Sequence, residues 1–240
     1  MIQSKHEKNF KKSSQDPVYD VDPDENTDEA EKYSAYEEQE EYIEADVSSP
    51  HLWFPEARKM HRDIYFHMGP TNSGKTYEAL QSLKSAEKGI YLAPLRLLAW
   101  EVTEKLREEN VRCSLLTGQE RSFSEFDTHI SCTIEMCKSE ETYDVAVIDE
   151  IQMIGDSERG WAWSNAFLSL KAKTIHLWGD SRSLHLISRI CTDTGDTLRV
   201  KNYERMSKLK VENMPVRSFK DLRPGDCIVG FSRRILFAVK

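Results

Sequence analysis

The sequence predicts an α/β fold with a mostly parallel, doubly wound sheet, and two observations support this prediction. From residue 61 onward, short apolar runs alternate with longer amphipathic stretches, which is typical of strands joined by helical crossovers. A glycine-rich segment at 69–76 lies between the first such run and the first amphipathic stretch, where doubly wound sheets carry their ligand loops. With 240 residues, of which 39% are hydrophobic, the chain can bury one substantial core.

The individual elements follow from this periodicity, and one helix shows it well. In the stretch 95–108, Leu95, Leu98, Val102 and Leu106 recur at helical spacing and are expected on one buried face. Strands are expected at 64–67, 90–93, 111–116, 129–133, 145–149, 174–178 and 197–200, and helices at 75–85, 95–108, 161–170 and 181–190. A last apolar run, 227–231, follows the turn-forming LRPGD and is expected to be a strand without a partner.

The first fifty residues differ in composition from the remainder. Residues 1–50 carry a net charge of −10, whereas the whole chain carries −8, so the remainder carries +2. Their few aliphatic residues predict a disordered acidic leader, with an interaction tail or a mimic of nucleic acid as the alternative. The nearly neutral remainder leaves room for a local basic groove.

Membrane and metal-binding signals are both weak. No stretch approaches the ~18 apolar residues of a membrane span, and no secretory signal lies near Met1, so we expect no membrane partner. The opening MIQSKHEKNFKKSS lacks arginine and is a poor transit peptide by composition. The cysteines form no CxxC pair, so we expect buried thiols and no cysteine metal site at Cys113, Cys132, Cys137, Cys191 and Cys227.

Residues 69–76 read GPTNSGKT and match the phosphate-binding loop pattern G-x-x-x-x-G-K-[ST] between a predicted strand and a predicted helix. Backbone N–H groups of such a loop wrap around phosphates at a helix N-terminus. We expect Lys75 to reach the β and γ phosphates of ATP and Thr76 to bind Mg²⁺. The expected nucleotide-binding residues of the loop are Gly69, Pro70, Thr71, Asn72, Ser73, Gly74, Lys75 and Thr76.

The second half of the expected nucleotide site is the run VAVIDEIQ at 145–152, an apolar strand that ends in two acids. Asp149 is expected to hold Mg²⁺, and Glu150 to orient and deprotonate the attacking water. A strand that ends in solvated acids is the bland alternative, which the preceding phosphate-binding loop disfavours.

Six sequence blocks in order carry a resemblance to a known family. They are GPTNSGKT, APLRLLA at 93–99, TGQER at 117–121, SCTIEMC at 131–137, VIDEIQMI at 147–154 and RGWAW at 159–163. Together they resemble superfamily-two DExH-type RNA helicases, closely the suppressor-of-Var helicases of the mitochondrial degradosome, over residues 61–231. The resemblance implies a RecA-like fold and ATP-driven RNA unwinding in mitochondrial RNA degradation.

The resemblance also implies roles for individual residues and partners. Gln152 matches the last position of the DExH-type box and would act with Lys75 and Glu150 in catalysis, and LWGD at 177–180 looks like the block that couples hydrolysis to strand separation. The implied partners are single-stranded or duplex RNA and an exoribonuclease, in the mitochondrial matrix or also in the nucleus. The residues matching the RNA track are Pro94, Arg96, Thr117, Gly118, Arg121, Thr133 and Glu135.

The resemblance further implies two RecA-like domains. We expect the leader at 1–50, the first RecA-like domain at 51–215 and the start of a second at 216–240, where GDCIVGFSRR resembles the first strand of that domain. In this family the second domain supplies arginines that stabilise the transferred phosphoryl group. We therefore expect the 240-residue fragment to bind ATP with Mg²⁺ weakly and to hydrolyse it very slowly.

Other interpretations remain open from the residues alone. Arg96 and Arg121 would be solvated charges without the family pattern, and Trp161 and Trp163 are expected in the core rather than stacked on bases. A nucleoside kinase of the thymidine kinase type shares the loop and a DE-x-Q strand end, but it carries a zinc-binding cysteine set that this sequence lacks. A non-catalytic fragment that binds RNA or a partner protein is the second alternative.

Overall fold

The computed structural model describes residues 49–70, 73–206 and 210–230, together with 232, 234 and 237. The acidic leader expected at 1–50 therefore lies outside the described residues except for Ser49 and Pro50, where a short 3-10 helix begins. The boundary expected at residue 215 stays a prediction.

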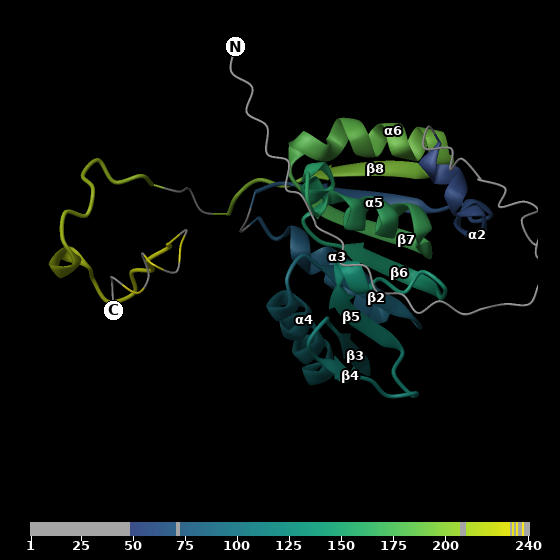
Figure 1. Ribbon diagram of the computed structural model, residues 1–240, viewed down its shortest axis with the longest axis horizontal. Helices are drawn as coiled ribbons and strands as arrows, with labels where there is room; N and C mark the ends of the chain where they lie inside the picture. Colours follow the sequence, from purple (N-terminus) through teal and green to yellow (C-terminus); the bar gives the residue numbers. More distant parts are fainter. Residues whose placement is uncertain are drawn as a thin grey trace, which may run out of the picture. The chain divides into compact units, whose positions relative to one another are not determined.

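An eight-stranded sheet forms the centre of the described part of the chain, in the order β4-β3-β5-β2-β6-β7-β1-β8 (Figure 1). All neighbouring strands are parallel except β3 and β4, which pair antiparallel. The strands are β1 Asp63–Met68, β2 Gly89–Ala93, β3 Cys113–Leu116, β4 Arg121–Ser122, β5 His129–Thr133, β6 Thr142–Ile148, β7 Lys171–Gly179 and β8 Thr197–Asn202. Because the connections between parallel strands need crossovers, the sheet is the doubly wound arrangement that the sequence predicts.

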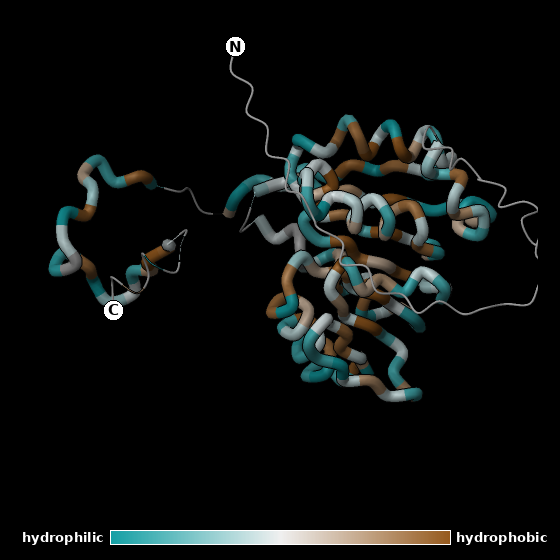
Figure 2. Tube along the Cα trace, viewed as in Figure 1, coloured by the Kyte–Doolittle hydropathy of each residue, from teal (hydrophilic) through white to brown (hydrophobic). Residues whose placement is uncertain are grey.

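Helices cover both faces of this sheet. The apolar residues of α3 and α4 form one buried cluster with one face, and those of α5 and α6 form a second cluster with the other. Figure 2 shows hydrophobic residues concentrated along the strands between these helices. The helices are η1 Pro50–Trp53, α2 Pro55–Arg58, α3 Lys75–Ser85, α4 Arg96–Glu108, η2 Ile134–Met136, η3 Ile151–Gly155, α5 Gly160–Ser169, η4 Ser181–Ser183, α6 Leu184–Thr194 and η5 Phe219–Asp221.

Apart from the strand expected at 227–231, the predicted elements are confirmed with small shifts in their bounds. Helix α3 and strand β5 have the expected limits, whereas β6 begins three residues earlier than predicted and ends before Asp149. The two-residue strand β4 was not predicted, because so short a segment carries no periodicity. Leu95 does not join the buried face of α4. It is the extended N-cap residue of that helix and is 58% exposed, so the helical spacing does not apply to it.

The strand expected at 227–231 is not formed over its described residues, 227–230, which have neither helical nor strand structure. A single strand cannot satisfy its backbone groups or bury its side chains without a sheet edge to pair with. The apolar composition of this run predicted a strand, but a strand also requires a neighbouring strand to pair with, so the prediction was wrong for residues 227–230.

A buried ion pair fixes the start of β1 to the chain before β8. The guanidinium of Arg62 donates to both carboxylate oxygens of Asp196, at 2.9 and 2.5 Å, and to the carbonyl oxygens of Phe167 and Leu170. Arg62 is fully buried, so each of these acceptors compensates for its lost hydration. Removing Asp196 would leave Arg62 buried without a counter-charge, which costs ~3–5 kcal/mol in comparable pairs. Removing Arg62 would still leave Asp196 with a second cation, Arg58, at 3.8 Å.

A hydrogen-bonded chain of two buried histidine rings and one partly exposed tyrosine ring connects β7, β1 and the segment after β8. His176 Nδ1 and His67 Nε2 are 2.8 Å apart, and His67 Nδ1 lies 2.8 Å from the hydroxyl of Tyr203. The Tyr203 hydroxyl in turn donates to Glu78 of α3 at 2.7 Å, and Lys201 pairs with the same carboxylate. Burial lowers the pKa of both histidines to about 4, so both rings are neutral in the folded protein near neutral pH.

These two histidines predict a loss of stability in mild acid. Between their ordinary pKa near 6.5 and about 4, the unfolded chain binds protons that the folded chain does not, so stability present above pH ~6.5 is lost as the pH falls through this window. We expect His176→Gln, which does not titrate, to reduce this pH dependence in urea unfolding. The exposed His185→Gln is the control, and equal slopes for His176→Gln and the unaltered chain would contradict the assignment.

Candidate functional site

The carboxyl edge of the sheet collects the loops that carry the predicted site residues. The segment 69–74 follows β1, Asp149 follows β6, and Asp180 follows β7, the strand that lies between the other two. Pro94 follows β2 and Thr117 follows β3 at the same edge. In a parallel sheet this edge is where ligands bind.

The loop 69–76 leads into α3, which begins at Lys75 and packs over β2, β6 and β7. Thr71 and Asn72 lie outside the described residues, and Lys75 and Thr76 are described through their backbone alone. Gly74, at the N-cap, has φ 77°, a left-handed conformation that favours glycine. The hydroxyl of Ser73 is buried without a hydrogen-bond partner among the described residues, so the loop holds a polar group suited to an external ligand.

Asp149 is held from both faces of the sheet. The hydroxyl of Tyr91, in the cluster with α3 and α4, donates to Asp149 Oδ2 at 3.0 Å. The indole of Trp163, in the cluster with α5 and α6, donates from Nε1 to the Asp149 carbonyl oxygen at 2.9 Å. Burial and the Asp149 charge raise the pKa of Tyr91 well above its ordinary value, so the hydroxyl remains a donor.

Glu150 is a non-glycine residue in the left-handed region, with φ 51° and ψ 48°. Its backbone N–H donates to Asp149 Oδ1 at 2.8 Å, and its carboxylate accepts a hydrogen bond from the Gln152 amide. Residues in this region cost ~1–3 kcal/mol and persist where the surroundings hold them. The predicted catalytic pair Glu150 and Gln152 is therefore brought together, with the carboxylate oriented by the amide.

Contacts at the end of β7 link the loop after β1 to the turn after β6. Gly69 N–H donates to the Gly179 carbonyl oxygen at 3.2 Å, and Gln152 Oε1 accepts from Asp180 N–H at 3.4 Å. A Cβ added to Gly179 would lie 2.6 Å from Ile151 Cγ2 and 2.7 Å from Gln152 Oε1. Only glycine permits this approach, so the three strand ends form one connected group.

Two residues of the predicted RNA track are tied to an arginine that was not assigned a role. Arg159 donates to the Pro94 carbonyl oxygen at 2.8 Å and to the Glu135 carboxylate at 2.7 Å. Its guanidinium also lies over the Trp163 ring, 5.3 Å from the centroid. The Glu135 carboxylate is therefore occupied by an ion pair. Thr133 precedes it at the end of β5.

The other predicted track residues lie around the loop after β3. The Thr117 hydroxyl accepts from the Glu120 N–H at 3.0 Å and donates to the Glu120 carbonyl oxygen, so it stabilises the loop itself. Arg96 is exposed at the first turn of α4 and donates to the Gln119 side chain. A Cβ on Gly118 would meet no neighbour within 4 Å, which makes its backbone open to approach. Arg121 is exposed on β4.

The two tryptophans of α5 differ in burial. Trp163 is fully buried, as expected, whereas Trp161 is 61% exposed, so the expectation of a core residue was wrong for Trp161. The buried face of α5 follows helical spacing through Gly160, Trp163 and Phe167, and Trp161 is turned away from it.

Among the described residues, no group of three or more His, Cys, Asp or Glu side chains is arranged to hold a metal ion. Cys113, Cys132 and Cys191 are buried, but Cys227 is exposed, contrary to expectation. No helix in the described ranges has the length and apolar character to cross a bilayer.

The parallel sheet, the glycine-rich loop after β1 and the adjacent acids after β6 define the class of P-loop nucleotide-binding domains. A family model described as the DEXQ-box helicase domain of Suv3 matches residues 50–203. The chain belongs to this family of DEXQ-box helicases. Membership sets aside the nucleoside kinase alternative.

Curated relatives agree with this assignment. The chain is 52% identical over 197 residues to the mitochondrial ATP-dependent RNA helicase SUV3L of Oryza sativa subsp. japonica, covering 82% of this chain and 27% of that protein. It is 48% identical to SUPV3L1 of Gallus gallus, covering 81% and 25%, and 48% identical to SUV3 of Saccharomyces cerevisiae, covering 81% and 27%. Both are likewise named mitochondrial ATP-dependent RNA helicases. The chain thus spans about a quarter of the length of these relatives.

Among solved structures, the chain is similar to an arterivirus nonstructural protein 10 helicase in complex with DNA, with a TM-score of 0.42 and 12% identity. This match covers 61% of this chain and 36% of the viral chain. The similarity is too low to bear on function.

The structure adds residues that the motifs did not single out. Tyr91 lies within a strand and Trp163 within a helix, so their side chains read as ordinary core residues, and only the fold shows that they meet at Asp149. Arg159 belongs to the RGWAW block, and this block could have identified it as a candidate site residue. Tyr203, whose N–H donates to the Met68 carbonyl oxygen at 2.8 Å beside the loop, follows the last strand and carried no motif.

Tyr91→Phe tests whether the hydroxyl orients the Asp149 carboxylate. We expect Mg²⁺-dependent binding of a fluorescent ADP analogue to weaken severalfold, while stability falls by about 1 kcal/mol, the usual value of one such hydrogen bond. Tyr143→Phe is the matched control, because its buried hydroxyl donates to the Lys138 carbonyl oxygen near the opposite end of β6. Equal nucleotide affinities for the two variants would contradict the role given to Tyr91.

Proposed function

We propose that this chain is the ATP- and RNA-binding domain of an ATP-dependent RNA helicase that acts in mitochondrial RNA degradation. The observation that carries the proposal is the connected group at the carboxyl edge, where the loop 69–74, Gly179, Gln152 and the acids after β6 are joined by hydrogen bonds and close contacts. The names of the relatives at 48–52% identity supply the reaction and the compartment.

The nucleotide side of the proposal rests on the loop after β1. Its backbone is preorganised by the left-handed Gly74 and by the hydrogen bond of Gly69 to β7. N–H groups at the start of α3 favour negative charge, because the helix dipole is positive there. The buried Ser73 hydroxyl, without a partner among the described residues, fits a phosphate oxygen as acceptor. Lys75 would add an ammonium to the β and γ phosphates.

The residues also fit a magnesium ion. Mg²⁺ is commonly held by one or two carboxylates and hydroxyls together with phosphate oxygens, and it keeps several waters. Asp149 and Thr76 are such a donor set, and Tyr91 and the Glu150 N–H orient the carboxylate. When bound, the ion would neutralise charge on the phosphates.

Glu150 is the group proposed to take a proton from the attacking water. Its left-handed backbone directs the side chain away from the path of β6, and the Gln152 amide holds one carboxylate oxygen. Gln152 also accepts from the backbone of Asp180, within the LWGD block. A movement of the Glu150 carboxylate would therefore shift the Gln152 side chain and, through it, the backbone at the end of β7. This pair of hydrogen bonds is a physical route for coupling hydrolysis to strand separation.

The RNA side of the proposal rests on the loops after β2, β3 and β5. Arg96 and the open backbone at Gly118 face solvent, where they can contact phosphates without base selectivity. Arg159 fixes Pro94 and Glu135, so these two residues shape the track rather than contact the strand. Thr133 and Arg121 would add a hydroxyl and a positive charge at its margins.

The partner and the location follow the family. An exoribonuclease partner comes from the family resemblance alone, and residence in mitochondria rests on the names of the relatives. The first RecA-like domain is proposed at 51–215, and the segment 216–240 as the start of a second.

Nucleotide binding by this chain tests the proposal most directly. We expect Lys75→Ala to weaken equilibrium binding of ATP with Mg²⁺ by roughly ten- to hundred-fold, because it removes charge-assisted hydrogen bonds to phosphate. Glu150→Gln should bind within a few-fold of the unaltered chain, since the carboxylate is assigned to the attacking water. Titration calorimetry measures both.

Lys84→Ala is the matched control, because this lysine lies in the last turn of the same helix and pairs with Glu109. It should bind ATP as the unaltered chain does. If Lys75→Ala and Lys84→Ala had the same affinity, the loop would not be a nucleotide site and the proposed function would fail.

A further inference from the structure

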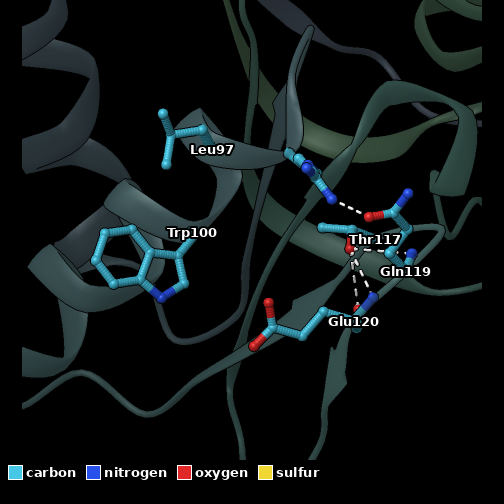
Figure 3. A pocket seen from close by; sticks show the side chains of 6 residues that line it. Leu97, Trp100, Thr117, Gln119 and Glu120 are labelled. Atoms are coloured by element: carbon cyan, nitrogen blue, oxygen red, sulfur yellow. Dashed lines mark hydrogen bonds between the residues drawn. The ribbon is translucent and has the colours of Figure 1, made fainter.

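A hollow of about 590 Å³ lies between the first turns of α4 and the loop after β3 (Figure 3). Arg96 and Thr117, both from the predicted RNA track, line it together with four residues that were assigned no role in binding from the sequence. The full lining is Arg96, Leu97, Trp100, Thr117, Gln119 and Glu120. The hollow therefore extends the track into a surface whose chemistry is not that of phosphate binding alone.

The wall formed by α4 is apolar and exposed. Leu97 is 66% exposed and Trp100 is 47% exposed, and their spacing of three residues places them on the same side of the helix. The buried residues of α4, among them Ala99 and Val102, face the sheet instead. An indole that is half open to water beside a cationic residue is the arrangement in which proteins stack unpaired bases.

The charged groups of the hollow lie at different places, with a cation at Arg96 and a carboxylate at Glu120. Arg96 donates to the Gln119 side chain and keeps further N–H groups for an anion, because a guanidinium has five. The Glu120 carboxylate extends toward the side on which Trp100 lies (Figure 3). A phosphate is attracted to the Arg96 end and repelled from the Glu120 end, so a strand in this hollow would place its backbone at Arg96 and a base at Trp100.

We propose that Trp100, supported by Leu97, is a stacking platform for one nucleobase of a bound single-stranded RNA, with a neighbouring phosphate at Arg96. The inference rests on the proposed function and adds a base contact to a track otherwise made of backbone contacts. Glu120 accepts a hydrogen bond from an exocyclic amino group of the stacked base, as carboxylates do with cytosine N4. Uracil offers a carbonyl oxygen at that position, so adenine or cytosine is preferred there.

Binding of a short fluorescent oligoadenylate, followed by anisotropy, tests this subsite. Trp100→Ala should weaken binding by roughly five- to hundred-fold, the range for loss of one stacked base, and Trp100→Phe should recover most of the affinity. Trp161→Ala is the matched control, because Trp161 is an exposed tryptophan on the opposite face of the sheet, and it should bind normally.

The salt dependence separates stacking from charge. Trp100→Ala should leave the slope of log affinity against log salt unchanged, whereas Arg96→Ala should reduce it by about one. An abasic strand should bind equally to Trp100→Ala and to the unaltered chain. Oligoadenylate should bind more tightly than oligouridylate, and Glu120→Gln should narrow that difference.

The outcomes distinguish this inference from the proposed function. If Arg96→Ala weakens RNA binding while Trp100→Ala does not, the track stands and the stacking subsite is wrong. If the unaltered chain binds RNA and neither variant weakens that binding, the strand lies elsewhere and the stacking subsite is wrong; if the unaltered chain does not bind RNA, the proposed RNA-binding function fails as well. If Trp100→Ala retains RNA affinity but changes self-association in sedimentation velocity, the exposed indole is a protein contact, and the stacking proposal is overturned.

Discussion

The position of Asp149 depends on hydrogen bonds from both hydrophobic clusters of the domain, one from Tyr91 to its carboxylate and one from Trp163 to its backbone carbonyl oxygen. Tyr91 belongs to the cluster under α3 and α4, and Trp163 belongs to the cluster under α5 and α6. Neither donor can move without disturbing a packed face of the sheet, because interiors are close-packed. The packing of the whole domain is thus the means by which the carboxylate is preorganised, which proteins need at sites where charge develops.

The same constraint explains why strain collects at the turn after β6. Glu150 is in a left-handed conformation directly after a residue whose backbone and side chain are both fixed. The turn continues into η3, where Ile151 is buried and Gln152 contacts the end of β7. The fixed residues on both sides of Glu150 therefore hold a backbone conformation that an isolated peptide would not keep. As a result, the Glu150 side chain lies at the carboxyl edge of the sheet.

The mostly parallel sheet and the identity of the loops at its carboxyl edge could be predicted from the sequence, whereas the order of the strands and the supports of the site could not. Apolar runs and the GPTNSGKT and VIDEIQ blocks place the loop and the acids at the ends of β1 and β6, since parallel strands share a carboxyl edge. Tyr91, Trp163 and Tyr203 act through contacts between residues 58, 14 and 136 positions apart. Such contacts exist only after the sheet has assembled, and no local pattern carries them.

The errors of the sequence interpretation also arise because burial is decided by the assembled fold and not by local sequence. Leu95 and Trp161 are apolar at positions where helical spacing or composition predicts burial, yet one is an extended cap and the other faces away from the sheet. Exposure of such residues costs hydrophobic stabilisation of ~1–3 kcal/mol each, so it persists most readily where a ligand or partner covers the surface. Leu97 and Trp100 are also exposed apolar residues, but they line one hollow together with Arg96. A surface that combines an exposed aromatic ring with a positive charge can stack a base and bind a phosphate at the same time, which suits a single strand of nucleic acid.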